Sequence, residues 1–461
     1  MKKLNVAVIL AAGRGERSGF EQPKQLMKLA GRPIIEHTIA AFQNTKAIDE
    51  ILVVTSKDCI SKIEELVATQ RFDKVKGVIL GGSERYESSV SAIEAYESRS
   101  RTCKIRLIFH DAVRPLANER TINDVVEALE NYNAVDVAVP TTDTIISVNP
   151  ISNTIDFIPE RSKLRNGQTP QGFAFETIKA AYYDALRDPN FKTTDDCGVV
   201  LKYLPDEKIY VVSGENDNIK LTYREDLHML DKLLQLRARK NSRDIDTKSF
   251  ASLKNKVMVI FGGTSGIGAE MAKIAEAHQA HVIVASRRTG TEISDIDSIK
   301  KLLSEVYDQY QRIDYVVNAA GILSKQPLVN MAYAEVMEAI HINYIGAVNV
   351  AIASFEYLRQ SRGQLLNFTS SSYTYGRAYY SLYSSSKAAV VNLTQALAEE
   401  WHSEDIRVNC INPERTDTPM RRQAFGREPA NTLLTAEAVA SQSLSVLIGG
   451  NTGQIFDIRR L

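Results

Sequence analysis

Tyr383 and Lys387 stand four residues apart in the stretch YSSSK, which places both side chains on one face of a helix. A free tyrosine has a pKa near ~10, so it is a poor proton donor or acceptor at neutral pH unless a neighbouring cation lowers that value. Lys387 is placed to supply such a charge. A surface contact explains the pair equally well when it stands alone, but Ser370 lies thirteen positions before Tyr383 at the end of a predicted strand. The three residues together favour a proton-transfer site over a surface contact.

The stretch VIFGGTSGIG at 259–268 is a strand that runs into a glycine-rich turn and then a helix. Glycines let the backbone approach a pyrophosphate, and the helix N-terminus supplies N–H donors. The residues that we expect at the pyrophosphate are Gly262, Ser265, Gly266, Ile267 and Gly268. Arg287 and Arg288 follow the next strand, where an NAD enzyme carries an acidic residue. Because arginine accommodates a 2′-phosphate, the pattern predicts NADPH.

With NAAG at 318–321, these motifs resemble the short-chain dehydrogenase/reductase family over roughly 254–461. The resemblance implies a Rossmann fold in which Tyr383 is the general acid of a reduction and Ser370 polarises the carbonyl. Lys387 would lower the pKa of the tyrosine and hold the nicotinamide ribose. The other residues implied at the cofactor are Asn343, for a proton-relay water, and Asn318 and Ala319, beside the central strands.

The chain begins with a second phosphate pattern, LAAGRGERSGFEQPKQL. Its density of glycines and cations after a strand suits a triphosphate, although it is not a Walker A loop. A solvated basic loop is the alternative on these residues alone. Asp111 in HDAVRP and Asp217 in DNIKLT end two further predicted strands or loops, and such carboxylates could hold Mg²⁺.

The first part of the chain resembles the cytidylyltransferases that make CDP-methylerythritol and CDP-ribitol, over roughly 1–235. In that family a substrate phosphate attacks the α-phosphorus of CTP and expels pyrophosphate. The implied catalytic cations are Arg17, Lys24 and Lys220, and the implied Mg²⁺ ligands are Asp111 and Asp217. The residues implied around CTP are Ala11, Ala12, Gly13, Arg14, Gly15, Gly81, Gly82, Arg85 and Ser88. The acceptor phosphate would meet Arg114, Thr144 and Arg161, the last two from a partner's hairpin, so we expect a homodimer.

Short β-branched runs alternate with amphipathic helical stretches throughout, which predicts α/β architecture with two Rossmann-like, mostly parallel sheets and helices on both faces. The stretch DTIISVNPISNTIDFIP interrupts the first sheet and predicts a protruding β-hairpin arm. The predicted domains are 1–236 and 253–461, joined by a charged linker at 237–252 that lacks apolar periodicity.

Composition narrows the class of protein. Lys plus Arg and Asp plus Glu balance at 56 each, so we expect no nucleic-acid or membrane partner. The four cysteines are far apart and without CxxC spacing, which favours a reducing cytoplasm over a disulfide or zinc framework.

The two halves suggest consecutive reactions, because reduction of ribulose 5-phosphate yields the acceptor that cytidylyl transfer from CTP requires. We therefore expect one chain to make CDP-ribitol, a donor for ribitol-phosphate polymers such as capsule or teichoic acid. NGQTPQGF at 166–173 also looks like the ribitol branch. Three alternatives remain open: methylerythritol phosphate cytidylylation beside an unrelated reductase, a different sugar such as xylulose phosphate, and a non-catalytic nucleotide-binding scaffold.

Overall fold

The computed structural model describes residues 2–13, 22–243 and 247–460 of the 461-residue chain. Contacts divide the chain into two compact units, Met1–Asp231 and Lys232–Leu461. Each unit is an α/β sandwich with its own sheet, which confirms the predicted fold class.

The sheet of the first unit has seven strands in the order β11-β7-β10-β6-β1-β4-β5. Every neighbouring pair is parallel except those of β10, which runs antiparallel to β6 and β7. The strands are β1 (Lys2–Ala11), β4 (Glu50–Thr55), β5 (Val75–Leu80), β6 (Cys103–Asp111), β7 (Ala134–Pro140), β10 (Arg165–Ala174) and β11 (Ile209–Ser213).

Helices cover both faces of this sheet because successive strand residues point to opposite sides. On β6, Ile108 packs with α1, α2 and α4, whereas Phe109 packs with α3, α5 and α6. The helices are α1 (Ile34–Asn44), α2 (Ile60–Thr69), α3 (Arg85–Ser100), α4 (Glu119–Ala128), α5 (Phe175–Ala185), α6 (Asp196–Tyr203) and α7 (Glu225–Arg243).

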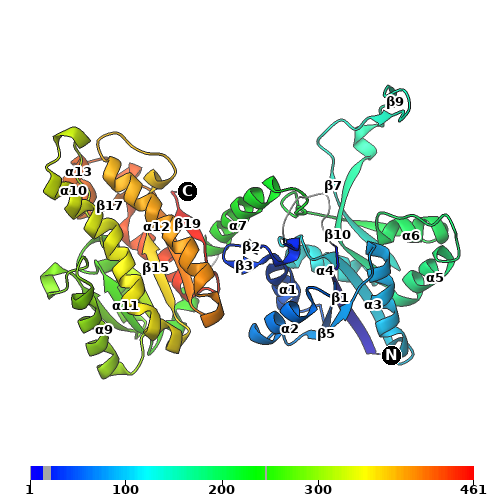
Figure 1. Cartoon of the computed structure of the whole chain (residues 1–461), viewed down its shortest axis with the longest axis horizontal. Coiled ribbons are helices and arrows are strands. Elements are labelled where there is room, and N and C mark those ends of the chain that lie inside the picture. The colour runs from blue at the N-terminus through cyan, green and yellow to red at the C-terminus, as the bar shows by residue number, and fades with distance from the viewer. Residues whose placement is uncertain (1, 14–21, 244–246, 461) are drawn as a thin grey trace. The chain divides into compact units, whose positions relative to one another are not determined.

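An arm protrudes from the first unit between β7 and β10, as Figure 1 shows. Its tip is the antiparallel pair β8 (Ser147–Val148) and β9 (Ile155–Phe157). The predicted hairpin is therefore present, and it leaves Ile151 95% exposed and Phe157 59% exposed.

The sheet of the second unit has six strands in the order β13-β12-β14-β15-β16-β19, all parallel. Helices α8 and α14 pack on one face and α9, α11 and α12 on the other. The main elements are β12 (Val257–Phe261), α8 (Gly266–Ala277), β13 (His281–Ala285), α9 (Ile296–Tyr310), β14 (Tyr315–Asn318), α10 (Tyr333–Ile340), α11 (Gly346–Ser361), β15 (Gln364–Phe368), α12 (Ser381–Glu400), β16 (Arg407–Pro413), α13 (Pro419–Phe425), α14 (Ala436–Ile448) and β19 (Ile455–Ile458). The sequence did not predict β19.

The segment predicted as a linker is partly helical. Helix α7 continues to Arg243, and a 3-10 segment, η4, occupies Thr247–Leu253. The boundary between the two units falls inside α7, after Asp231. The limits of the linker at 237–252 stay a prediction, and residues 244–246 lie outside the described part of the chain.

One described helical stretch, Tyr333–Ser361, is long and apolar enough to cross a membrane by length and composition. Half of its apolar window is buried inside the protein.

We expect Ile260→Ala to destabilise the second unit by about 2–5 kcal/mol, because Ile260 is fully buried at the centre of β12 and the truncation leaves a cavity. Trp401, the only tryptophan in the chain, is buried in the same unit, so its fluorescence during urea unfolding reports this unit. Val329→Ala at a 92% exposed position is the control and should change the free energy of unfolding by less than about 0.5 kcal/mol. Equal effects of the two substitutions would contradict this packing.

Candidate active sites

A cavity of about 590 Å³ lies at the carboxyl ends of the strands of the second unit. It brings together most of the residues that the sequence predicted for a dinucleotide and a carbonyl substrate. Those that line it are Gly262, Ser265, Gly266, Ile267, Gly268, Arg287, Arg288, Ala319, Ser370, Tyr383 and Lys387. Asn318 and Asn343 are buried next to it and do not belong to its lining.

The glycine-rich turn after β12 needs its glycines for conformation and for space. Gly262 has φ +79°, and a Cβ there would lie 2.7 Å from the backbone nitrogen of Ala320. A Cβ at Gly268 would lie 2.5 Å from the carbonyl oxygen of Gly262. Only glycine lets the turn pack this closely while α8 begins at the cavity.

Arg287 and Arg288 form a short 3-10 turn after β13. The backbone N–H of Arg288 donates to the Ser286 hydroxyl at 3.2 Å, and Gly290, with φ +86°, ends the turn. Arg287 lies 3.6 Å from Glu338 in an ion pair whose two side chains are both more than half exposed. Such a pair is weak, so the guanidinium groups can bind an incoming anion.

Tyr383 and Lys387 both project from α12 into the cavity. The Lys387 Nζ donates to the carbonyl of Phe368 at 2.9 Å and lies 5.8 Å from the centre of the Tyr383 ring. Burial lowers the pKa of Lys387 to about 8.

Burial also raises the pKa of Tyr383 to about 12, although a hydrogen bond from Ser370 opposes the shift. The expectation that Lys387 lowers the pKa of this tyrosine is therefore wrong in direction here. Loss of solvent is the largest cause of the raised pKa of Tyr383, and Lys387 is not among the groups that shift it.

Asn343 lies in a π-helical turn, η7 (His341–Ile345), between α10 and α11. Its side chain exchanges two 2.9 Å hydrogen bonds with the backbone of Ile322. A Cβ at Gly321 would meet both the Asn343 Oδ1 and the Lys387 Nζ, at 3.0 and 3.5 Å, so the two side chains share one neighbourhood. Asn318 donates to Asn367 at 3.5 Å across β14 and β15.

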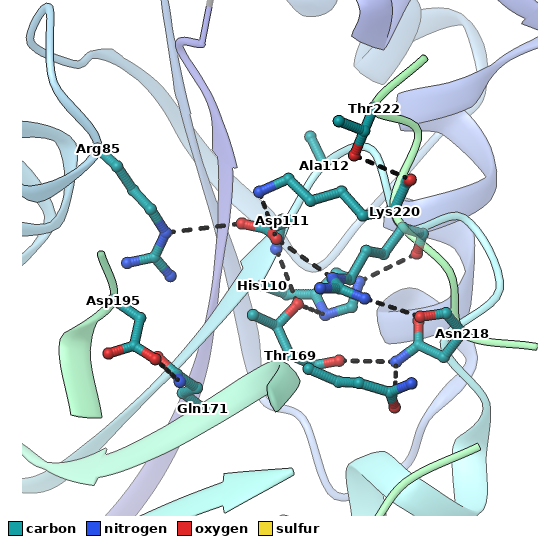
Figure 2. Close-up of polar contacts among 12 residues, drawn as sticks. Arg85, His110, Asp111, Ala112, Thr169, Gln171, Asp195, Asn218, Lys220 and Thr222 are labelled. Atoms are coloured by element: carbon teal, nitrogen blue, oxygen red, sulfur yellow. Dashed lines mark hydrogen bonds and ion pairs between the residues drawn. The ribbon is translucent and has the colours of Figure 1, made fainter. Parts of the chain in front are cut away.

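The centre of the first unit's site is Asp111, which ends β6 (Figure 2). Its Oδ2 lies 3.1 Å from the Lys220 Nζ and 3.2 Å from the Arg114 Nε, and its Oδ1 lies 3.6 Å from the Arg85 Nε. Burial alone would raise the pKa of Asp111, but Lys220, Arg85 and Arg114 hold it well below its usual range. The carboxylate is therefore ionised at every physiological pH.

His110 and Thr169 lie beside Asp111 and were not predicted from the sequence. Thr169 accepts a hydrogen bond from the Asp111 backbone at 3.2 Å, and its hydroxyl contacts the His110 Nδ1 at 3.0 Å (Figure 2). Burial lowers the pKa of His110 to about 4, so the ring is neutral near pH 7. Asn218 donates to the Thr169 carbonyl at 2.8 Å and joins the loop after β11 to β10.

Asp196 was also missed. Its fully buried carboxylate accepts a 2.6 Å bond from the Arg85 Nη1 and another of 2.6 Å from the Tyr182 hydroxyl. Arg85 consequently lies between Asp196 and Asp111, and these two carboxylates raise the pKa of its guanidinium above the usual value against the effect of burial.

The remaining residues predicted for CTP lie at two strand ends. Ala11 and Ala12 end or follow β1, with Gly13 next to them, and Gly81 and Gly82 follow β5. A Cβ at Gly81 would lie 2.4 Å from the hydroxyl of Ser88, which is buried without a hydrogen-bond partner in the described structure. Arg14, Gly15 and Arg17 lie outside the described residues.

Lys24 donates to the Thr222 carbonyl at 2.7 Å, which brings the end of the first loop to the segment that carries Lys220. Thr144 and Arg161 are exposed on the arm segment, where Arg161 donates to the Thr142 carbonyl at 3.3 Å. Asp217 is partly buried one residue before Asn218. Within the described ranges, no group of three or more His, Cys, Asp or Glu side chains could hold a metal by itself.

The family model for 2-C-methyl-D-erythritol 4-phosphate cytidylyltransferase matches residues 5–235, and the short chain dehydrogenase model matches residues 288–429. The chain is 45% identical over 458 residues to the bifunctional ribulose 5-phosphate reductase/CDP-ribitol pyrophosphorylase Bcs1 of Haemophilus influenzae, covering 99% of this chain and 96% of that protein. It is 42% identical over 232 residues to the 2-C-methyl-D-erythritol 4-phosphate cytidylyltransferase of Thermobifida fusca (strain YX), covering 50% of this chain and 92% of that one. The crystal structure of a 4-diphosphocytidyl-2C-methyl-D-erythritol synthase from Anaerococcus prevotii DSM 20548 is 31% identical, with a TM-score of 0.45, over 50% of this chain and 96% of that chain.

The buried Lys387 predicts a pH dependence of stability. Its pKa is about 8 in the folded protein and higher when unfolded, so above pH 8 the unfolded state binds more protons and the free energy of unfolding rises with pH. We expect wild type to gain stability relative to Lys387→Met between pH 7.5 and 9, by at most about 1.4 kcal/mol per pH unit. Urea unfolding followed by Trp401 fluorescence measures the two slopes.

The comparison stops at pH 9 because burial raises the pKa values of Cys410 and Tyr383 to about 12. Above pH 9 the unfolded state loses these two protons first, so the free energy of unfolding falls with pH and opposes the effect of Lys387. Parallel pH profiles for the two proteins would contradict a depressed lysine pKa.

Proposed function

The chain belongs to the family of bifunctional ribulose 5-phosphate reductases/CDP-ribitol pyrophosphorylases, and on that premise we propose that it makes CDP-ribitol in two steps. The second unit reduces ribulose 5-phosphate to ribitol 5-phosphate with NADPH. The first unit then transfers the cytidylyl group of CTP to that product and releases pyrophosphate. The observation that carries the proposal is the 45% identity to Bcs1, which extends through both units rather than one.

For the reduction, the nicotinamide of a bound dinucleotide would supply the hydride. The carbonyl oxygen becomes an alkoxide and takes the proton of Tyr383, while the Ser370 hydroxyl polarises the carbonyl. A tyrosine with a pKa raised to about 12 keeps its proton until the alkoxide forms, which suits a general acid. Lys387, held by the Phe368 carbonyl, would stabilise the resulting phenolate and hold the ribose, and Asn343 would support the water that restores the proton.

For the transfer, an oxygen of the acceptor phosphate attacks the α-phosphorus of CTP and the bond to pyrophosphate breaks. The protein contributes positioning and neutralisation of charge. Lys24, Lys220 and Arg17 would surround the phosphates, and the glycines and Ser88 would lie about the cytidine.

Mg²⁺, a hard ion that binds oxygen, would be held by Asp111 and Asp217 together with substrate phosphates, and it would neutralise phosphate charge. The donor set fits this use. Both side chains are carboxylates, and no acidic cage in the described chain could bind the ion without a phosphate.

The arm supports a homodimer in the proposal. It exposes Ile151, Phe157 and Ile158, apolar side chains that a second copy would cover. Thr144 and Arg161 of the partner's arm would then meet the acceptor phosphate beside Arg114. We propose that the partners are small-molecule substrates and that the protein is cytoplasmic. The CDP-ribitol would serve as the donor for ribitol-phosphate polymers such as capsule or teichoic acid.

A second candidate comes from the relatives that cover the first unit alone, which are named for 2-C-methyl-D-erythritol 4-phosphate. Supplying CTP with each polyol phosphate separately distinguishes the two acceptors. A marked preference for the methylerythritol compound would contradict CDP-ribitol synthesis.

We expect wild type with ribulose 5-phosphate, NADPH, CTP and Mg²⁺ to yield CDP-ribitol, identified by mass spectrometry. Tyr383→Phe should reduce ketone turnover at least about 100-fold by removing the proton donor, while cytidylylation of supplied ribitol 5-phosphate continues. Lys24→Ala should have the converse effect. A folded single variant that loses both half-reactions would contradict two independent sites.

Cofactor preference should depend on Arg287 and Arg288. Replacing both with alanine should weaken NADPH binding about 10- to 100-fold, since hydrogen bonds to a charged phosphate are worth about 1.5–3 kcal/mol. The dissociation constant of NADH should change little, because it lacks the 2′-phosphate. Arg359→Ala on the exposed side of α11 is the control. Wild-type preference for NADH would overturn this assignment.

A further inference from the structure

The reductase cavity is lined near Tyr383 by cationic side chains that have no role in the proposed reaction. Arg377, Arg415 and Arg421 all line the cavity with Tyr383. They come from separate places in the fold, the segment between β15 and α12, the loop after β16, and α13. Three separate segments thus bring arginines to the substrate end of one cavity.

Arg421 is held in a defined orientation. Its Nε and Nη2 donate to the Glu428 carboxylate at 2.7 and 2.9 Å, and its guanidinium carbon lies 4.6 Å from the centre of the Phe425 ring. Because Glu428 occupies one edge of the guanidinium, the Nη1 remains for another acceptor.

A chain of aromatic contacts connects Arg421 to the proton donor. The Phe425 ring meets Tyr380 edge-on at 5.9 Å, and Tyr380 lies 6.5 Å from Tyr383. The charge of Arg421 also lowers the pKa of Tyr383 slightly, which places the two groups within electrostatic range.

The backbone of Arg377 is held by a hydrogen bond, whereas its side chain is exposed and could bind a ligand. Its N–H donates to the hydroxyl of Ser384, the residue after Tyr383, at 3.4 Å. The guanidinium is exposed and makes no hydrogen bond or ion pair with any described residue.

The surrounding charge is positive. The hydrogen bond from Arg421 and the charges of Arg415 and Lys325 lower the pKa of Glu428, so these cations gather about one carboxylate. Lys325 also lies near the Phe425 ring, with its Nζ 4.5 Å from the ring centre. The Glu428 carboxylate is already paired with Arg421, so a dianion would find further positive charge from Arg377 and Arg415 here.

The phosphates of the dinucleotide have other partners, since the glycine turn and the two arginines after β13 line a different part of the same cavity. A guanidinium fork matches phosphate oxygens in geometry as well as charge. We infer that Arg377 and Arg421 bind the phosphate monoester of the ketose phosphate whose carbonyl Tyr383 protonates, with Arg415 adding positive charge. This inference rests on the proposed reduction of a sugar phosphate and names the group that selects it.

The test compares ribulose 5-phosphate with unphosphorylated ribulose, each with NADPH. We expect Arg377→Gln to raise KM for ribulose 5-phosphate about 10- to 100-fold with kcat largely kept, and to leave kcat/KM for ribulose and KM for NADPH unchanged. Arg377→Gln with Arg421→Gln should abolish the preference of wild type for the phosphorylated ketose. Arg362→Gln, an exposed arginine after α11, is the matched control and should change none of these values.

Inorganic phosphate gives a second readout that does not depend on turnover of the sugar phosphate. It should protect wild type, and not the double variant, from unfolding as followed by Trp401 fluorescence, and it should compete with ribulose 5-phosphate in wild type. Trp401 fluorescence without phosphate confirms that each variant is folded.

The outcomes separate the two hypotheses. A wild type that reduces ribulose 5-phosphate, with an Arg377→Gln and Arg421→Gln double variant whose KM is unchanged, overturns the phosphate subsite and leaves the proposed function standing. A wild type that does not reduce ribulose 5-phosphate overturns the proposed function, and phosphate protection lost in the double variant would still support the subsite.

Discussion

Each unit buries an ionisable side chain at the carboxyl ends of its parallel strands, where water cannot solvate the charge. Both candidate sites depend on the protein groups that replace this lost solvation. Asp111 ends β6 and Lys387 packs against the end of β15, and both are nearly inaccessible. Parallel strands all end at one edge of a sheet, so this edge is where loops can bring ligands and partners together. The two units compensate for the buried charge in opposite ways.

In the first unit, one nearby cation and two cations from distant segments compensate the Asp111 carboxylate. Arg85 starts α3, Arg114 follows β6, and Lys220 lies in the loop after β11. Asp196, which also accepts a hydrogen bond from Tyr182, in turn fixes the orientation of Arg85, one of the residues predicted around CTP. A site built from paired charges is already organised for a polyanion, because an incoming phosphate can exchange with a carboxylate for the same cations.

In the second unit, the neutral carbonyl of Phe368 is the only hydrogen-bond partner that the described residues offer the Lys387 ammonium group, and burial lowers the pKa of Lys387 to about 8. Tyr383 beside it loses solvent as well and becomes a weaker acid. Desolvation therefore sets the protonation of both groups, and it leaves the tyrosine protonated and able to donate. In the proposed reaction, the phenolate that forms on Tyr383 would supply the negative charge that the described surroundings of Lys387 lack.

The sequence alone predicted those features of the two sites whose residues are close together in the chain. The Tyr383–Lys387 pair, the glycine turn and the arm each follow from residues close together in the chain, and the structure confirms their conformations.

The sequence was insufficient where contacts join distant segments. Asp196 lies 111 positions from Arg85, and Thr169 lies 59 from His110, so no motif spacing could reveal either pair. The pKa of Tyr383 was misjudged for a related reason, because the sequence shows a neighbouring lysine but not the burial that raises this pKa, which is a property of the folded unit. The arginines around Tyr383 belong to the same class: Arg377 and Arg421 are 44 positions apart, and only the folding of the loop after β15 and of α13 onto one cavity brings them together. In the proposed function, local motifs thus account for the reaction of each unit, and long-range packing accounts for the choice of substrate.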